Sequence, residues 1–119
     1  MNKKMKKTQI LVVGYNEATL QKILSEINNN DGWEAIGTTD DEKAIELFHH
    51  RNIDLVILGD GLTETIVNRL KKLFTLQNPH LSLIIHIGTN SSVLVQEIDA
   101  TLKSIKEKEL NVIDNPFQS

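Results

Sequence analysis

The chain has 119 residues, of which 39% are hydrophobic and 24% charged, and its formal net charge at pH 7 is −3. These values are ordinary for one soluble globular domain, and the negative charge does not favour binding to nucleic acid. The absence of cysteine excludes disulfides, thiolate nucleophiles and cysteine-ligated zinc. No apolar run approaches the roughly 18 residues that span a bilayer and no secretory signal is visible, so we expect a cytoplasmic protein without membrane contact.

The chain begins with a basic, polar segment that carries lysines at positions 3, 4, 6 and 7. We expect residues 1–8 to form a flexible, solvated tail and residues 9–119 to form the domain. The apolar run Ile10–Val13 predicts a first strand, which ends at Gly14. A helix capped by Asn16 follows, because apolar residues recur from Leu20 to Ile27 at the spacing of one helical face.

Three more strands of similar length alternate with helical patterns along the chain. Trp33–Thr38 is the predicted second strand, Asp54–Leu58 the third and Leu81–Ile87 the fourth. Thr39 and Glu42 have the spacing of a capping box, which predicts the start of the second helix. Apolar strands alternating with helices indicate a parallel sheet covered on both faces.

The C-terminal part of the chain contains a long helical pattern followed by a short apolar run. The helix is predicted to begin near Ser91, and Leu110–Ile113 is predicted to be a fifth strand. We therefore expect an α/β fold of the doubly wound, flavodoxin-like type. Because ligands bind outside the carboxyl ends of the strands in such sheets, the residues after each strand are the candidate site.

Several of these segments resemble the receiver domain of two-component response regulators. Ile10–Val13 resembles the family's first strand, which normally runs into two acidic residues. Asp54–Leu58 resembles the third strand, which normally precedes the phosphoaccepting aspartate. Glu42–Glu46 is similar to the family's second helix, and Val112–Phe117 is similar to its fifth strand and Lys-Pro-Phe ending. The resemblance implies five parallel strands in the order 2-1-3-4-5, with the family's last helix missing after Ser119.

Each part of the receiver phosphotransfer site is altered in this sequence. A receiver needs a carboxylate nucleophile, a Mg²⁺ held by further carboxylates, and a cation near the phosphoryl oxygens. The altered positions are Gly14 and Tyr15 at the acidic pair, Gly59 at the acceptor, Gly88 at the switching Ser or Thr, and Asn115 at the lysine before proline. The resemblance therefore implies a degenerate pseudo-receiver, and we expect no catalytic residue, no metal and no cofactor.

Four residues near these strand ends have two interpretations each. Asp60 lies between two glycines and is interpreted as a turn residue, with a displaced phosphoacceptor as the alternative. His86 interrupts an apolar strand, so it is either a neutral imidazole bonded to a neighbour or a pocket residue. Thr89, rather than Gly88, takes the position of the switching Ser or Thr if the alignment with the receiver family is shifted by one residue. Asp60, His86 and Thr89 are the candidate pocket residues. The ring of Tyr15 either fills the emptied pocket or contacts a partner.

The missing last helix would leave the sheet face beside the first helix without cover, which is uncommon for a monomer. We therefore expect a signalling module, not an enzyme, that acts independently of phosphorylation. It would bind a protein partner or a second copy through this face and through the region of the fourth helix and fifth strand. The alternative is a small-ligand-binding or enzymatic flavodoxin-like domain that uses the glycine-lined strand ends, since the fold does not determine the function.

Overall fold

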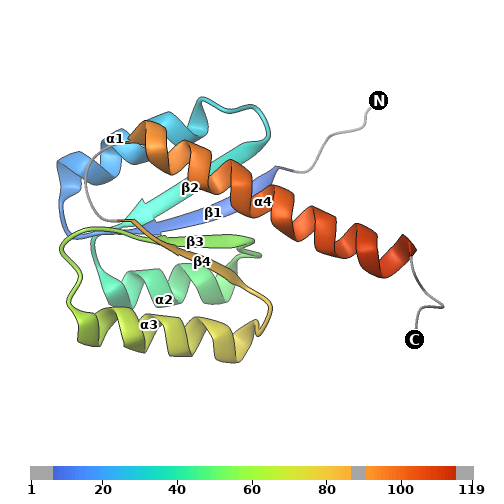
Figure 1. The fold of residues 1–119 in the computed structure, drawn as a ribbon. Helices are drawn as coiled ribbons and strands as arrows, with labels where there is room; N and C mark the ends of the chain where they lie inside the picture. The colour runs from blue at the N-terminus through green and yellow to red at the C-terminus, as the bar shows by residue number, and fades with distance from the viewer. Residues whose placement is uncertain (1–6, 87–90, 115–119) are drawn as a thin grey trace.

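The computed structural model describes residues 7–86 and 91–114, apart from the side chains of residues 91 and 106–114. Strands and helices alternate along the whole described chain (Figure 1). Their bounds are β1 (Thr8–Val13), α1 (Glu17–Asn28), β2 (Trp33–Thr38), α2 (Asp41–His50), β3 (Leu55–Leu58), α3 (Glu64–Gln77), β4 (Ser82–Ile85) and α4 (Ser91–Asp114). No helix in these ranges is both long enough and apolar enough to cross a membrane.

The described strands form one parallel sheet in the order β2-β1-β3-β4. Helices α1 and α4 lie on one face of the sheet, and α2 and α3 lie on the other (Figure 1). The expected doubly wound α/β class is therefore confirmed. Strand β1 lies between β2 and β3, so it is covered on both edges and both faces. This explains why Ile10–Val13 is buried throughout.

The helix starts are set by side-chain caps. Asn16 accepts a hydrogen bond from the Thr19 amide at 2.9 Å, which confirms the predicted cap of α1. The predicted capping box of α2 is wrong, because Asp40 rather than Thr39 is the cap and accepts from the Glu42 amide at 3.0 Å. A carboxylate one residue later in the chain takes the position that the hydroxyl was expected to take.

Two apolar clusters separate the sheet from its two helical layers. The cluster beneath α1 and α4 consists of Ile10, Val12, Leu20, Ile23, Ile27, Ala35, Leu55, Ile57, Ile84, Leu94 and Ile98. The cluster above α2 and α3 consists of Leu11, Val13, Ala44, Phe48, Ile53, Val56, Leu58, Leu70 and Phe74. Alternate residues of each strand enter opposite clusters, as the two-residue period of a strand requires.

The predicted fifth strand is wrong for the described chain. Residues 110–113 belong to α4, which runs without interruption from Ser91 to Asp114, and the sheet has four strands rather than five. The reason is visible in the sequence between these two residues, which contains neither glycine nor proline. Without a helix breaker, the short apolar run at its end continues the helix that precedes it.

The predicted uncovered face beside the first helix is also wrong, because α4 covers it. Leu94 and Ile98 of α4 are fully buried in the same cluster as α1, and Leu102 packs against them. Helix α4 therefore lies beside α1 on the same side of the sheet (Figure 1). One helix thus fills the place for which the sequence analysis expected a missing helix or a partner.

Gly37 in β2 marks the close approach of α1 to the sheet. A Cβ atom on Gly37 would lie 2.9 Å from both the Leu20 Cδ1 atom and the Val12 carbonyl oxygen. We expect Gly37→Ala to lower the free energy of unfolding by about 1–3 kcal/mol, because the Val12 backbone cannot move aside without breaking the sheet. Urea denaturation measures this change.

Gly32→Ala is the matched control for that prediction, because a Cβ atom on Gly32 would meet nothing within 4 Å. We expect the control to change stability by no more than about 0.5 kcal/mol. Equal stability of the two variants would show that α1 does not pack on β2 as closely as described.

Candidate functional site

The residues that follow β1, β3 and β4 come together at the carboxyl end of the sheet. The Gly59 amide donates to the Val13 carbonyl at 2.7 Å, and the His86 amide donates to the Leu58 carbonyl at 2.9 Å. A Cβ atom on Gly14 would lie 3.9 Å from the Gly59 Cα atom. The structure therefore places Gly14, Gly59 and His86 side by side, while Gly88, Thr89 and Asn115 lie outside the described residues.

The backbone at Gly59 does not require glycine. Gly61 is the residue with positive φ in the described chain, so Gly59 has an ordinary backbone conformation. The nearest neighbour of a Cβ atom on Gly59 would be the Val13 carbonyl oxygen at 3.5 Å, which is an ordinary van der Waals distance. A Cβ atom would therefore fit there without moving a neighbour, so the fold does not require glycine at this position.

Asp60 lies in a turn whose geometry depends on the following glycine. Gly61 has φ +92°, a conformation that favours glycine, and its Cβ atom would lie only 2.8 Å from the Tyr15 Cβ atom. The Tyr15 amide donates to the Asp60 carbonyl at 3.2 Å, which ties this turn to the β1–α1 loop. These contacts support the interpretation of Asp60 as a turn residue.

A cavity of about 10 Å³ remains between the glycines and α1. It is lined by Val12, Val13, Gly14, Asn16, Thr19, Leu20, Ile23, Gly59 and Asp60. This is about the smallest space that holds one water molecule, so a nucleotide or a flat ring does not fit. Tyr15 is not part of the lining and its side chain is 40% exposed, so its ring does not fill the emptied pocket.

The carboxylates near this end of the sheet, from Asp60, Glu64 and Glu97, do not form a metal-binding group. Asp60 is the acidic residue of the cavity lining, and the described residues contain no group of three or more His, Asp or Glu side chains that could hold a metal ion. A receiver holds Mg²⁺ with several carboxylate oxygens, because this hard cation prefers oxygen ligands. The residues present here do not supply that ligand set.

His86 is buried under the first turns of α4. Its side chain is 6% exposed, and its Nδ1 atom lies 3.4 Å from the Glu97 Oε1 atom. Its Nε2 atom has no hydrogen-bond partner among the described residues. The neighbour that the sequence analysis expected for His86 is thus Glu97, which no spacing rule could have indicated because it arrives from another element.

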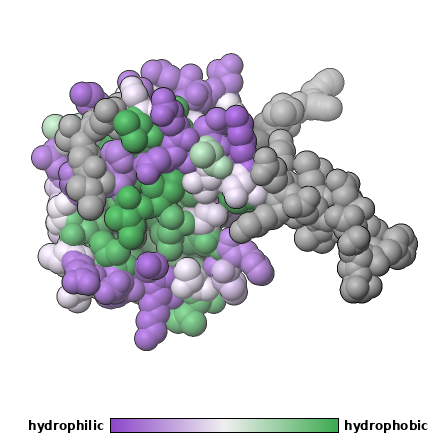
Figure 2. Space-filling view, viewed as in Figure 1, coloured by the Kyte–Doolittle hydropathy of each residue, from purple (hydrophilic) through white to green (hydrophobic). Residues whose placement is uncertain are grey.

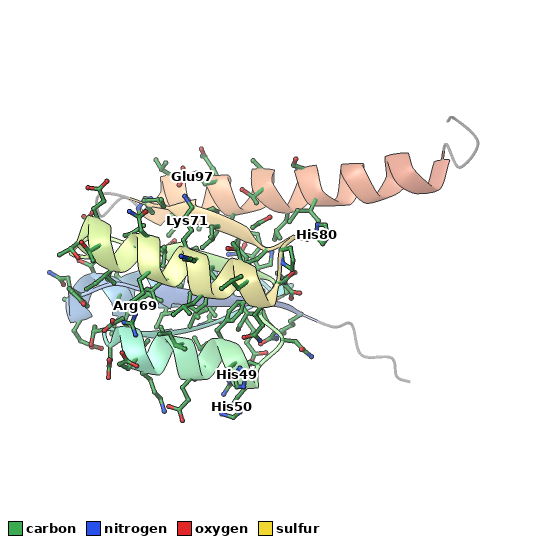
Figure 3. All side chains as sticks on the ribbon, turned by 90° about the horizontal axis from the view of Figure 1, so that it is seen from below. His49, His50, Arg69, Lys71, His80 and Glu97 are labelled. Atoms are coloured by element: carbon green, nitrogen blue, oxygen red, sulfur yellow. The ribbon has the colours of Figure 1, made fainter. Side chains whose placement is uncertain are left out.

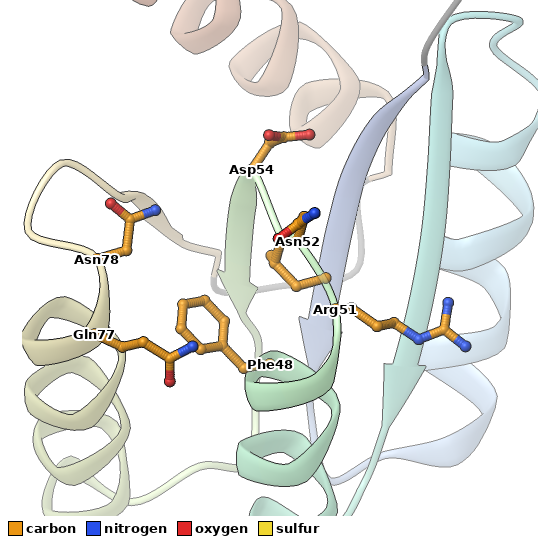
Figure 4. A pocket seen from close by; sticks show the side chains of 7 residues that line it. Phe48, Arg51, Asn52, Asp54, Gln77 and Asn78 are labelled. Carbon is orange, nitrogen blue, oxygen red and sulfur yellow. The ribbon is translucent and has the colours of Figure 1, made fainter.

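Among the larger hollows of the described chain, two lie at opposite ends of the sheet. One of about 370 Å³ lies beside β4 and is lined by Gly59, Asp60, Gly61, Leu62, Glu64, Val67 and Ile85. The other, of about 360 Å³, lies near the amino end of β3, where α2 and α3 end (Figure 4). There the Asp54 carboxylate accepts from the Gln9 amide at 2.8 Å, so this carboxylate holds the sheet together. The first hollow includes Gly59 and the candidate pocket residue Asp60, whereas the sequence analysis did not identify the second.

Comparison with known proteins gives matches in structure but not in sequence. No family model matches the chain, and neither does any curated protein. The signal receiver domain of a LuxO repressor protein from Vibrio parahaemolyticus matches with a TM-score of 0.73 and 13% identity, over 87% of this chain and 96% of that one. The receiver domain of an HD domain-containing protein from Pseudomonas fluorescens Pf-5 matches with a TM-score of 0.69 and 16% identity, over 92% and 96%.

A CheY-like response regulator receiver domain from Methanospirillum hungatei JF-1 matches with a TM-score of 0.65 and 14% identity, over 87% of this chain and 99% of that one. The predicted resemblance to receiver domains is therefore confirmed at the level of the fold. Similarity between structures at this level of identity establishes architecture, whereas activity depends on the residues of the site.

Proposed function

We propose that this chain is a pseudo-receiver domain, a cytoplasmic signalling module that binds other proteins without being phosphorylated and that is not an enzyme. The observation that carries the proposal is Gly59. By the resemblance to receiver domains, the residue after the third strand stands at the acceptor position, and Gly59 has no side chain, although the backbone would accept one. Phosphoryl transfer to a receiver needs a carboxylate nucleophile at that point.

The surroundings of Gly59 support the same conclusion. Gly14 and Tyr15 supply no carboxylate at the positions where the resemblance implies the magnesium ligands of a receiver, and Tyr15 is not among the residues that line the cavity. Charge that develops during phosphoryl transfer must be neutralised by positioned cations. Asp60 is the carboxylate of this cavity lining, and the described residues contain no group of three or more acidic or histidine side chains that would hold such a cation.

The small-ligand alternative is restricted to one side of the glycine-lined strand ends. Ligand pockets usually have volumes of about 300–1,000 Å³. The space between Gly14, Gly59 and α1 is about 10 Å³, whereas the hollow beside β4 that Gly59, Asp60 and Gly61 line is about 370 Å³ and is the one place for such a ligand at these strand ends in the described chain. We favour a protein partner because the receiver fold is retained without a carboxylate at Gly59. The function is then carried by elements that contact another protein.

Treatment with acetyl phosphate and Mg²⁺ tests the proposal directly. We expect the intact mass of the protein to stay unchanged, because the acceptor position has no carboxylate. We also expect beryllofluoride with Mg²⁺ to leave the melting temperature unchanged. A receiver domain with its aspartate present, treated in parallel, is the positive control. Gly59→Asp is also expected to show no increase in mass, since the magnesium ligands remain absent.

An increase in mass by one phosphoryl group would contradict the proposal. Asp60→Asn then identifies the acceptor: loss of the added mass in this variant would make Asp60 a displaced phosphoacceptor and the chain an active receiver. Asp60→Asn keeps the shape of the side chain, so its fold is expected to be preserved.

A further inference from the structure

The sequence contains two aspartates that are followed directly by glycine, Asp31–Gly32 and Asp60–Gly61, and it contains no Asn-Gly pair. An aspartate before glycine can react with its own main chain, because glycine has no side chain to block the approach to its amide nitrogen. The reaction needs a carboxyl group that can rotate onto this nitrogen and an amide that is not engaged in a hydrogen bond. The two pairs differ in both respects.

The first pair lies in the exposed turn between α1 and β2. The surface where α1 ends is mostly hydrophilic (Figure 2). The Trp33 amide closes the turn by donating to the Asn30 carbonyl at 3.1 Å, and the Gly32 carbonyl accepts from the Thr8 amide at 2.8 Å. The Gly32 amide itself donates no hydrogen bond within the described part of the chain. It is therefore available to the Asp31 side chain when this surface turn opens.

The Asp31 carboxylate has no hydrogen-bond or ion-pair partner within residues 7–86 and 91–114. Carboxylates elsewhere in the chain are held in place: Asp41 and Glu42 bond the Arg69 guanidinium at 3.0 and 2.9 Å, between α2 and α3 (Figure 3). The hydrogen bond to Glu42 is the main cause of the raised pKa of Arg69. Without such a partner, the Asp31 side chain is free to rotate toward the Gly32 nitrogen.

The second pair is held more tightly. Gly61 has φ +92°, and a Cβ atom on it would lie only 2.8 Å from the Tyr15 Cβ atom, so this glycine is packed against the β1–α1 loop. The Asp60 carbonyl accepts from the Tyr15 amide at 3.2 Å, and the Asp60 residue is only partly exposed. Rotation of this turn would disturb the packing of the loop, whereas the first turn has no such constraint.

We propose that Asp31–Gly32 is a site of spontaneous modification, at which the aspartate becomes isoaspartate through a cyclic imide. The Gly32 nitrogen attacks the Cγ atom of the protonated Asp31 carboxyl group. The N–Cγ bond forms, the bond from Cγ to the hydroxyl oxygen breaks, and the hydroxyl leaves as water with the amide proton. Water then opens the ring. Addition at Cγ restores aspartate, and addition at the main-chain carbonyl carbon of Asp31 gives isoaspartate with the starting mass.

Isoaspartate lengthens the main chain where α1 leads into β2, because the chain then passes through the Cβ and Cγ atoms of residue 31. The pair Thr8 and Trp33 is the first of the β1–β2 register. The hydrogen bonds from Thr8 to Gly32 and from Trp33 to Asn30 both depend on the geometry of this turn. We therefore expect the modification to loosen the amino end of β2.

The effect should stay local, because a second contact holds β2 to the end of α1. The Asn28 side chain accepts from the Ala35 amide at 2.8 Å and donates to the Ala35 carbonyl at 3.2 Å. Both bonds lie outside the modified peptide. The remaining pairs of the sheet are then expected to persist.

Ageing of the purified chain tests the site. The protein is kept at mildly acidic pH and physiological temperature, and an isoaspartyl methyltransferase with labelled S-adenosylmethionine then marks isoaspartate carboxylates. Peptide mapping locates the label. We expect it to accumulate on the peptide that contains Asp31, with the intact mass before labelling unchanged. The peptide that contains Asp60 should stay unlabelled over the same time.

Three variants test the chemistry of the step. Gly32→Ala places a methyl group beside the attacking nitrogen, and the turn accepts it because a Cβ atom there would meet nothing within 4 Å. Asp31→Glu keeps the charge but would need a larger ring. We expect both variants to lose the label at this site. Asp31→Asn is expected to gain the small mass that replacement of an amide by a carboxyl group adds, because the same ring then forms with loss of ammonia.

Urea denaturation tests the effect on β2. The isoaspartate form is separated from the unmodified protein by ion-exchange chromatography, and the fluorescence of Trp33 follows unfolding. We expect a lower urea midpoint for the isoaspartate form, because hydrogen bonds at the start of β2 are lost. Equal midpoints would overturn the inferred loosening of the strand.

The labelling result decides the proposed site. Label on the Asp60 peptide equal to or above that on the Asp31 peptide, label on neither, or full labelling of Gly32→Ala would overturn it. These readouts are independent of the pseudo-receiver proposal, because the turn precedes the amino end of β2 whereas Gly59 follows the carboxyl end of β3. A chain that accepts a phosphoryl group would leave the isoaspartate result unchanged.

Discussion

Ile98→Ala is expected to destabilise the whole domain by about 2–5 kcal/mol, because it leaves a cavity in a closed part of the core. Ile98 is fully buried in the cluster that joins α4 to α1 and the sheet. The single tryptophan, Trp33, packs against the same cluster and reports unfolding by its fluorescence. Urea denaturation followed by this signal and by circular dichroism measures the change.

The cooperativity of that transition is as informative as its midpoint. If α4 is part of the cooperatively folded domain, the urea midpoints measured by tryptophan fluorescence and by circular dichroism should fall by the same amount in Ile98→Ala, since a small domain unfolds as one unit. Gln96→Ala is the control: Gln96 is exposed on the same helix, and alanine is a strong helix former, so stability should change by no more than about 0.5 kcal/mol. Equal effects of the two substitutions would mean that α4 does not cover the α1 face.

Phe74→Ala is expected to cost about 3–5 kcal/mol, the largest effect of a single substitution on the opposite layer. Phe74 is 1% exposed, and its ring stacks on that of Phe48 with 4.3 Å between the ring centroids. The substitution removes both the buried area and this stacking, which together hold α3 to α2. The same denaturation experiment measures the loss.

Two comparisons make this prediction specific. Leu76→Ala on the same helix should have little effect, because Leu76 is 72% exposed. A double-mutant cycle with Phe48→Ala should show coupling of about 0.5–1.5 kcal/mol, since aromatic pairs contribute beyond their area. Strictly additive effects would contradict the direct contact between the rings.

Much of the fold was predictable because local patterns and tertiary packing agree in the first two thirds of the chain. Trp33–Thr38 was predicted with the bounds that β2 has, and Asn16 caps α1 as its position indicated. The spacing of apolar residues, every second residue in a strand and every third or fourth in a helix, shows which face of the element is apolar. This information is contained in the sequence of the element itself. The candidate residues Gly14, Tyr15 and Gly59 could be found for the same reason, since they directly follow predicted strands.

The C-terminal third was predicted less well because its patterns are ambiguous. A short apolar run such as Leu110–Ile113 fits a strand or the end of a helix, and the absence of a preceding helix breaker decided for the helix. The contact between His86 and Glu97 depends on how α4 packs against the sheet. No spacing rule within one element contains that packing.

The sequence by itself determined the chemistry available at the strand ends, because residue identity decides whether a carboxylate can be present at all. Gly59 has no nucleophile in any conformation. Only the tertiary structure decided that α4 lies beside α1 and that β4 is the last strand of the sheet in the described part of the chain. An apolar stripe on a helix shows that it must be buried, but the same stripe fits either face of the sheet, so the choice of layer depends on which surfaces the rest of the chain leaves uncovered.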